Sequence, residues 1–321
     1  MKLLTISIAG YNVERYITQT LESLCCRNIS KLEIFIVDDG GNDKTLEIAR
    51  AYANRFPDSF FPVHKQNGGW GSTVNYSIEH ATGKYFKLLD GDDFFDTANL
   101  DCFLEQLENI NADVVYTPYL TFDHKTGEVV EKYDLSSTYD LYKDYDVDKL
   151  TFSEGLEMHA LTFKTEILRK NNVSITEKAF YTDNEYRCKG MAYCRSIVFT
   201  NLCLYHYRVG LQGQSIDLNG LKKHYMDAIK VAESLIDFHK NTVNELPPFV
   251  LLCVQNALDF AYRALIFLKL KDELRAFDMD VKRHGRIYYQ TSFTTLKILR
   301  WLRMNFLGII SYRLKKTLGC S

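Results

Sequence analysis

The sequence lacks most of the features that would place it in a specialised class of protein. Its eight cysteines include no Cys-x-x-Cys pair, which argues against a zinc site and favours reduced, mostly buried thiols. No uninterrupted apolar run is long enough to span a membrane, and no signal peptide is recognisable, so a cytoplasmic protein is predicted. The net charge of −2 over 321 residues gives no reason to expect nucleic acid as a partner.

Strand-like and helix-like segments alternate regularly over the first part of the chain. Apolar runs at 4–9, 32–37, 61–64 and 85–89 are predicted strands, and apolar residues at helical spacing lie between them. Alternation at this rhythm favours right-handed βαβ units and a mainly parallel sheet flanked by helices. The sequence therefore predicts an α/β fold.

An acidic motif follows the last of these runs directly. Asp90, Asp92 and Asp93 place three carboxylates within four residues, where like charges repel one another. Mg²⁺ or Mn²⁺ would relieve this repulsion, because these cations bind one or two carboxylates together with substrate phosphates. The alternative is a solvated turn in which Asp93 or Asp96 caps the next helix.

Three turns rich in Gly, Asp and Asn fall at predicted strand ends, at 10–12, 38–43 and 90–93. Each could be an ordinary strand–helix turn. In a parallel sheet, however, the carboxyl ends of the strands meet at one edge, and ligands bind there. We therefore expect a binding site at this edge.

The motifs of this segment resemble those of the family 2 glycosyltransferases, which use nucleotide sugars. The matching motifs are Ala9-Gly10-Tyr11-Asn12, Val37-Asp38-Asp39-Gly40 with Asp43, Asn67-Gly68-Gly69 with Asn75, and Ala81-Thr82-Gly83-Lys84-Tyr85 leading into Asp90-Gly91-Asp92-Asp93. The resemblance implies the GT-A fold over residues 1–217, with a nucleotide-binding half at 1–97 and an acceptor half at 98–217. Residues 218–321 are predicted to form a helical C-terminal region.

The resemblance also implies how the donor is bound. Asp39 is expected to hydrogen-bond the base, usually uracil, while Ala9 and Tyr11 provide its floor and stacking face. Asn67 and Gly68 are expected to line the donor site.

In the acidic motif, the resemblance implies that Asp92 ligates Mn²⁺ or Mg²⁺ and that Asp90 lies near the ribose or a metal-bound water. His206 is a further candidate for reaching the metal, although a single histidine in a strand is more often packed in the core.

Two positions depart from the family pattern. Gly10 or its neighbour replaces a common proline, and Val74 stands where an arginine often precedes Asn75. A phosphate or sugar contact is therefore expected from elsewhere, with Lys65 or Arg208 as candidates. Arg208 is the predicted ligand of the donor diphosphate.

The catalytic base is sought among the acidic residues near 183. An inverting transfer needs a group that takes the acceptor's proton as its hydroxyl attacks the anomeric carbon. Asp183 matches the family's carboxylate at the start of a helix and is the predicted base, with Glu185 as the alternative acid. A purely structural interpretation makes Asp183 a helix N-cap.

The middle of the chain is predicted with less detail. Segments 114–120 and 197–207 are each predicted to form one strand, and 132–149 is interpreted as loops near the acceptor entrance. Segment 249–270 is apolar but carries several polar residues, which favours a packed helix over a spanning one.

The last 37 residues, 285–321, contain no Asp or Glu. Their seven basic residues are Arg286, Lys297, Arg300, Arg303, Arg313, Lys315 and Lys316. With the apolar residues among them, this composition favours an amphipathic segment on an anionic membrane. The alternative is that 296–314 packs as a core helix or a dimer contact.

Together these features predict a metal-dependent, inverting hexosyltransferase. It would move a sugar from a nucleoside-diphosphate donor, UDP-linked by the resemblance, to a hydroxyl of a saccharide or lipid-linked acceptor. Synthesis of a cell-surface polysaccharide or glycolipid is the expected setting, at the inner face of the membrane. The alternatives are a sugar-phosphate nucleotidyltransferase and a degenerate transferase domain that only binds.

Overall fold

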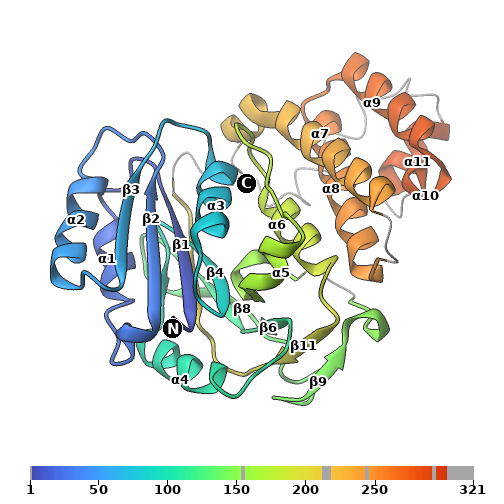
Figure 1. Cartoon of the computed structure of the whole chain (residues 1–321). Coiled ribbons are helices and arrows are strands. Elements are labelled where there is room, and N and C mark those ends of the chain that lie inside the picture. Colours follow the sequence, from blue (N-terminus) through green and yellow to red (C-terminus); the bar gives the residue numbers. More distant parts are fainter. Residues whose placement is uncertain (1, 153–155, 212–217, 243–245, 291–293, 302–321) are drawn as a thin grey trace.

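The structure, a computed structural model, describes residues 2–152, 156–211, 218–242, 246–290 and 294–301. These residues form a large sheet with helices on both faces, a smaller sheet, and a helical C-terminal region (Figure 1). The predicted α/β class and the helical C-terminal region are both confirmed.

The large sheet has eight strands. In spatial order they are Phe60–His64 (β3), Leu32–Asp38 (β2), Leu4–Gly10 (β1), Tyr85–Asp90 (β4), Leu161–Lys164 (β10), Val114–Tyr116 (β6), Ser196–Phe199 (β11) and Asp144–Asp146 (β9). Strands β1 to β4 are mutually parallel, whereas β10 runs antiparallel to both of its neighbours. The four predicted strands of the first half are therefore confirmed to within one residue at each end.

The helices of the first two-thirds of the chain cover the large sheet. They are Ile17–Glu22 (α1), Thr45–Arg55 (α2), Trp70–His80 (α3), Thr97–Leu107 (α4), Thr165–Lys170 (α5) and Asp183–Met191 (α6). Single 3₁₀ turns occur at Ile29–Lys31 (η1), Val147–Lys149 (η2) and Met158–Ala160 (η3). Because the crossovers are right-handed and the strand order reverses after β3, α3 covers the face opposite α1 and α2 (Figure 1).

A second sheet contains the strands Phe94–Phe95 (β5), Tyr205–Val209 (β12), Tyr119–Asp123 (β7) and Val129–Tyr133 (β8). It corrects two predictions, because 114–120 and 197–207 each form two strands that lie in different sheets. Pro118, which has no backbone N–H for a sheet ladder, separates β6 from β7. The interpretation of 132–149 as loops alone is also wrong, since β9 forms the edge of the large sheet beside β11.

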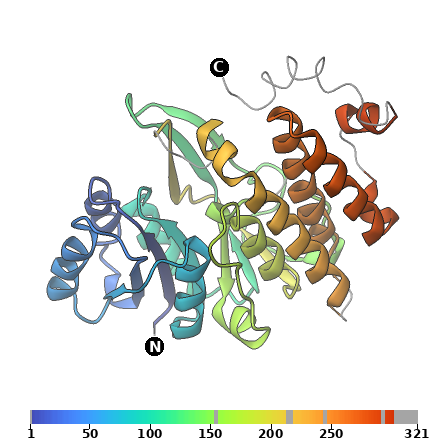
Figure 2. The same cartoon turned by 90° about the horizontal axis from the view of Figure 1, so that it is seen from above.

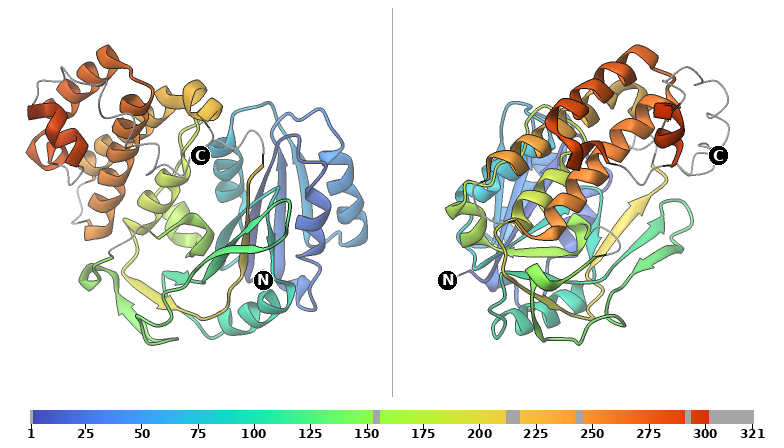
Figure 3. Two further views of the ribbon diagram at one scale, coloured as in Figure 1. Left: turned by 180° about the vertical axis from the view of Figure 1, so that it is seen from behind. Right: turned by 90° about the vertical axis from the view of Figure 1, so that its right-hand side faces the viewer.

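The C-terminal helices lie at the opposite end of the molecule from the first strands (Figures 2 and 3). They are Leu218–Asn241 (α7), Pro248–Phe267 (α8), Lys271–His284 (α9), Arg286–Tyr289 (α10) and Thr294–Trp301 (α11). By length and composition α8 could cross a membrane, yet 61% of its apolar window is buried inside the protein. It packs against α6 and α7, which supports the prediction of a packed helix.

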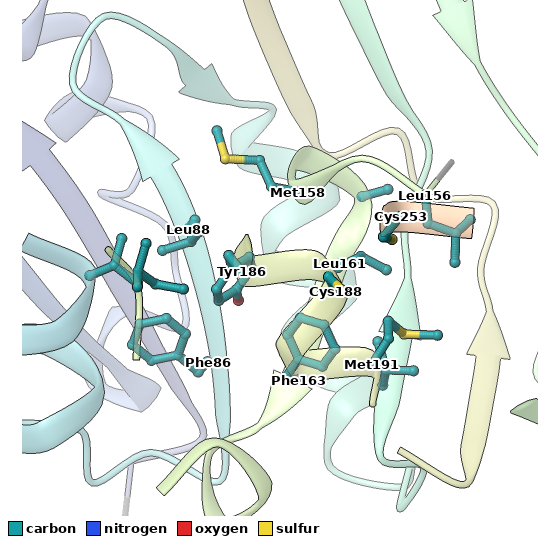
Figure 4. Close-up of a cluster of buried hydrophobic side chains, with 14 of the residues drawn as sticks. Phe86, Leu88, Leu156, Met158, Leu161, Phe163, Tyr186, Cys188, Met191 and Cys253 are labelled. Carbon is teal, nitrogen blue, oxygen red and sulfur yellow. The ribbon is translucent and has the colours of Figure 1, made fainter. Parts of the chain in front are cut away.

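Helix α6 joins the sheet to the helical region through a continuous apolar cluster (Figure 4). Tyr186 is fully buried between the rings of Phe86 on β4 and Phe163 on β10, 6.3 and 5.3 Å away between ring centroids. Cys188, two residues further along α6, lies on the side towards Cys253 of α8 (Figure 4). The position of α6 is thus fixed from both sides by packing.

Candidate active site

The carboxyl ends of β1, β2 and β4 meet at one edge of the large sheet. Ala9 stands beside Asp90 in the register of β1 and β4, and Gly10 stands beside Asp38 in that of β1 and β2. The three predicted turns therefore converge, as expected for a parallel sheet.

Asp39 is buried at this edge and its carboxylate is held by several donors. Oδ1 accepts from Gly68 N–H at 2.9 Å, from Lys65 Nζ at 2.9 Å and from Ser72 Oγ at 3.2 Å. Oδ2 accepts from Gly69 N–H at 2.7 Å. These bonds fix the carboxylate as an oriented acceptor, and they place Lys65 beside Asp39 rather than beside the acidic motif.

Asn67, Ala9 and Tyr11 are also predicted to bind the donor. The Asn67 side chain donates to the Asp39 carbonyl at 2.9 Å, which closes the loop that contains Gly68. Ala9 is partly exposed at the end of β1, and the ring of Tyr11 is 55% exposed. The exposed ring is available to stack on a planar ligand.

The acidic motif begins on Asp90, whose Oδ1 accepts a 2.8 Å hydrogen bond from the indole of Trp70. The turn after Asp90 lies close to β1, because a Cβ on Gly91 would come within 2.7 Å of the Ala9 carbonyl oxygen. Only glycine fits at this position without a shift of the backbone. The predicted capping role falls to Asp96, whose carboxylate accepts from Asn99 N–H at 2.7 Å.

Asp93 points into the protein and is held by β12. Its Oδ2 accepts from the Tyr205 hydroxyl at 2.7 Å and its Oδ1 from Arg208 N–H at 2.7 Å. The Arg208 guanidinium is buried, and it donates to the Asp92 carbonyl at 2.7 Å and to Gln19 Oε1 at 2.6 Å. In this conformation Arg208 therefore stabilises the acidic turn through the Asp92 carbonyl and the Asp93 carboxylate.

Burial destabilises the charged forms of the three carboxylates, and neighbouring carboxylates add to this for Asp90 and Asp93. Burial, followed by the charge of Asp92, raises the pKa of Asp90 to about 7. Burial raises the pKa of Asp92, and burial with the charges of Asp92 and Asp90 raises the pKa of Asp93 well above its usual range. A bound cation would relieve this repulsion.

A group that could hold such a cation is formed by Asp90, Asp93 and His159, whose ligand atoms lie within 4.8 Å of one another. His159 Nδ1 is buried and has no hydrogen-bond partner among the described residues. Burial, Lys87 and Arg187 lower the pKa of His159 to about 3, so its imidazole is neutral and able to ligate a metal. Two carboxylates and one imidazole are groups that ligate divalent cations, and this set alone does not select one metal.

His159 was missed by the sequence analysis, because it lies on η3, far along the chain, with no motif around it. Asp92, the predicted metal ligand, is not part of this group but is partly exposed on the same turn. His206, the other histidine considered, packs its ring on Phe94 with 4.8 Å between centroids.

The predicted base, Asp183, is the first residue of α6, and Thr182 occupies the N-cap position. The charge of Asp183 is among the smaller contributions that raise the pKa values of Asp90 and Tyr207, which indicates that its carboxyl lies near the acidic motif. Burial raises the pKa of Asp183, and the Arg187 guanidinium opposes that rise. Arg187 is itself held by Glu157 at 2.6 Å.

Glu185, the alternative acid, is fully buried and occupied by structural contacts. It accepts from Thr176 N–H at 2.6 Å and from the Thr176 hydroxyl at 2.9 Å. The Ser234 hydroxyl of α7 and the Lys189 ammonium, 3.2 Å away, also contact its carboxylate. These contacts leave Asp183 as the better candidate for the base.

The sequence model of glycosyl transferase family 2 matches residues 5–170, and the chain belongs to this family. The minor teichoic acid biosynthesis protein GgaB of Bacillus subtilis strain 168 is 27% identical over 268 residues. That alignment covers 80% of this chain but only 28% of GgaB, so the chain spans less than a third of this relative.

Solved structures share the fold. The S. aureus TarS 1–349 complex with UDP-GlcNAc superposes with a TM-score of 0.64 at 19% identity, covering 86% of this chain and 78% of TarS. The mannosyltransferase PcManGT of Pyrobaculum calidifontis, in complex with GDP-Man and Mn²⁺, has a TM-score of 0.54 at 14% identity, covering 98% of this chain and 84% of PcManGT. At these identities the likeness shows the GT-A fold alone.

Proposed function

We propose that this chain transfers a sugar, with inversion, from a nucleoside-diphosphate donor to an acceptor hydroxyl. The observation that supports the proposal is that the charge of Asp183 reaches Asp90 of the acidic motif, whereas Glu185 is held by Thr176 and Lys189. A carboxylate on the acceptor side and a cation-binding group on the donor side are the two parts that such a transfer requires.

The donor nucleotide would lie along the carboxyl ends of β1 and β2. Asp39 would accept a hydrogen bond from the base, Ala9 and Tyr11 would contact its ring, and the loop with Asn67 and Gly68 would close the pocket. The UDP-GlcNAc bound by TarS supports a uridine donor, and the oriented carboxylate of Asp39 suits the N–H of uracil.

The described residues whose ligand atoms lie close enough to share a divalent cation are Asp90, Asp93 and His159, and Asp92 is proposed as a further ligand from the same turn. The Mn²⁺ in PcManGT supports this assignment. When bound, such a cation would neutralise the charge of the departing diphosphate.

At the anomeric carbon, the bond from the acceptor oxygen forms as the bond to the diphosphate oxygen breaks. The acceptor's proton passes to the carboxylate of Asp183, and the nucleoside diphosphate leaves. Arg187 favours the charged form of Asp183 that can accept this proton. The two substrates react because the fold holds them in line.

The acceptor is proposed to be a saccharide or a lipid-linked saccharide at an anionic membrane. The relation to a teichoic acid biosynthesis protein supports an acceptor in cell-surface polymer synthesis. The basic C-terminal residues would bring the enzyme to the inner membrane face as a peripheral protein. Most of them, from Arg303 onward, lie outside the described residues.

Release of nucleoside diphosphate from a panel of UDP-, GDP- and CDP-sugars, with and without Mn²⁺, tests the proposal. Turnover with a sugar donor is expected, and Asp183→Asn should lower it by roughly 100- to 10,000-fold. Glu79→Ala on the exposed side of α3 is the matched control. Pyrophosphate release from a sugar phosphate and UTP would indicate a nucleotidyltransferase instead. UDP binding with no turnover of any donor would indicate a domain that only binds.

A further inference from the structure

The loop that precedes α6 is fastened to α3 by one side-chain amide, that of Asn75. Its Oδ1 accepts from Ile175 N–H at 2.8 Å, and its Nδ2 donates to the Ile175 carbonyl at 2.8 Å. Nδ2 also lies 3.3 Å from Oε1 of Glu177. Asparagine can serve both backbone groups of one residue because it carries a donor and an acceptor.

The backbones of the two segments also touch directly. Lys178 N–H donates to the Gly68 carbonyl at 2.6 Å, and a Cβ on Gly71 would come within 2.3 Å of the Thr176 carbonyl oxygen. Lys178 and Tyr181 have φ angles of 53° and 64°, which are unfavourable for residues with side chains and persist only where surrounding contacts hold them.

Each side of this contact leads to a carboxylate of the candidate site. On the donor side, the N–H groups of Gly68 and Gly69 hold Asp39. On the other side, Thr176 donates twice to Glu185 in the first turn of α6, and α6 begins at Asp183.

We propose that Asn75 is a positioning residue that keeps the loop at 175–178, and through it Asp183, in a fixed place relative to the donor loop. The inference rests on the proposed transferase function. Displacement of a reacting group by about 1 Å lowers turnover by about 100-fold. The contacts that hold Asp39 do not involve Asn75, so binding of the nucleotide does not depend on it.

The test compares Asn75→Ala with Glu79→Ala, which lies on the same helix with an exposed side chain. We expect Asn75→Ala to lower kcat by about 10- to 100-fold and to leave the Kd for UDP, measured by calorimetry, within about threefold. Asn75→Asp keeps only the bond from Ile175 N–H, so its kcat is expected to lie between those of Asn75→Ala and the unmodified protein. An unchanged kcat overturns the proposal, and so does an equal loss of UDP affinity, which would indicate general unfolding.

Hydrogen exchange with UDP and Mn²⁺ provides a readout that does not depend on turnover. In the unmodified protein, UDP is expected to slow exchange at 67–72 and also at 175–187, whereas in Asn75→Ala the protection is confined to 67–72. Protection of both segments in the variant, or of 67–72 alone in the unmodified protein, contradicts the proposal. If no donor is turned over but this pattern is found, the proposed transferase function fails while the positioning contact stands.

Discussion

The indole N–H of Trp70 donates a 2.8 Å hydrogen bond to Oδ1 of Asp90. Trp70 is the first residue of α3 and follows the loop that holds Asp39, whereas Asp90 ends β4. The bond therefore connects the loop that holds Asp39 to the acidic motif. It also favours the ionised form of Asp90 against burial and the neighbouring carboxylates, which raise its pKa to about 7.

Trp70→Phe should weaken the binding of Mn²⁺. Loss of a hydrogen bond to a charged group costs about 1.5 kcal/mol, or roughly tenfold in affinity. Without this bond the pKa of Asp90 should rise further, so protons compete more strongly with Mn²⁺ for its carboxylate near neutral pH. The loss of Mn²⁺ affinity should shrink at higher pH, where Asp90 is ionised in both the variant and the unmodified protein. Activity against Mn²⁺ concentration at several pH values measures this, with Tyr76→Phe on α3 as control. A defect that is the same at all pH values would contradict the explanation.

Mutation of the two histidines considered as metal ligands, His159 and His206, should have different effects. His159→Asn should raise the Mn²⁺ concentration for half-maximal activity by at least about 10- to 100-fold, because the loss of a group that only orients a metal ligand already costs that much. His206→Asn should not, because that ring packs on Phe94. Asp92→Asn should abolish transfer and Mn²⁺-dependent UDP binding. Full activity of Asp92→Asn after EDTA treatment would exclude the metal role.

Asp183 and Glu185 should respond differently to loss of charge. Asp183→Asn should retain the fold and UDP affinity and lower kcat by roughly 100- to 10,000-fold. Glu185→Gln should instead destabilise the protein by about 3 kcal/mol, since a buried carboxylate paired with Lys189 is lost. Thermal unfolding and kinetics on both variants distinguish the roles. Normal turnover by Asp183→Asn would remove it as the base.

The strands and the edge of the sheet that holds the site could be predicted because the signals are local. Strands buried on both faces, such as β1 and β2, appear as largely apolar runs, and their alternation with helices predicts a parallel sheet. The convergence of Asp39 and Asp90 follows, because the carboxyl ends of parallel strands meet at one edge. No comparable local signal shows that 114–120 is divided at Pro118. The segment is continuous in sequence pattern, but its two halves lie in different sheets.

Residues that join the site from distant elements could not be predicted. His159 and Trp70 reach the acidic motif only through the packing of η3 and α3, and neither has a local pattern that indicates a ligand or a positioning role. Asn75 was visible as part of a motif, but its partner Ile175 is 100 residues away. Long-range contacts of this kind depend on loop conformations that local composition does not determine.

Lys87 should make stability depend on pH. It is fully buried in β4, its ammonium donates to the His159 carbonyl at 2.9 Å, and burial lowers its pKa to about 7. The unfolded chain, with an ordinary lysine pKa, binds more protons than the folded chain between about pH 7 and 10. This residue's contribution to stability therefore rises with pH in that window, by up to about 1.4 kcal/mol per unit.

Lys87→Met should remove that slope. The free energy of unfolding of the variant, minus that of the unmodified protein, should be largest near neutral pH and should fall as the pH approaches about 9. Urea unfolding at a series of pH values measures the difference, with Lys31→Met, which removes a partly exposed lysine paired with Glu108 at 2.8 Å, as control. A difference independent of pH would mean that Lys87 is charged throughout.

The start of the basic C-terminal segment packs on the helical region, which determines where the chain can be cut to test membrane binding. Leu296 and Leu299 of α11 are fully buried, and Arg300 donates to Asp278 at 2.8 Å while its guanidinium lies 3.6 Å from the centre of the Tyr289 ring. The start of the basic segment therefore packs on the helical region, in agreement with the alternative interpretation. A chain cut near residue 284 would lose this packing as well as any membrane contact.

A chain that ends at 301 keeps α11 and removes residues 302–321, which include the remaining four basic residues, Arg303, Arg313, Lys315 and Lys316. Each basic residue near an anionic surface contributes about 1 kcal/mol, so the full chain should float with phosphatidylserine vesicles at low salt and be released at high salt. The chain ending at 301 should remain unbound with unchanged thermal stability, and a full-length variant with those four residues changed to Gln should behave like it. If both shortened and full chains float equally, or neither floats, the basic tail does not bind membranes and the acceptor must be reached in another way.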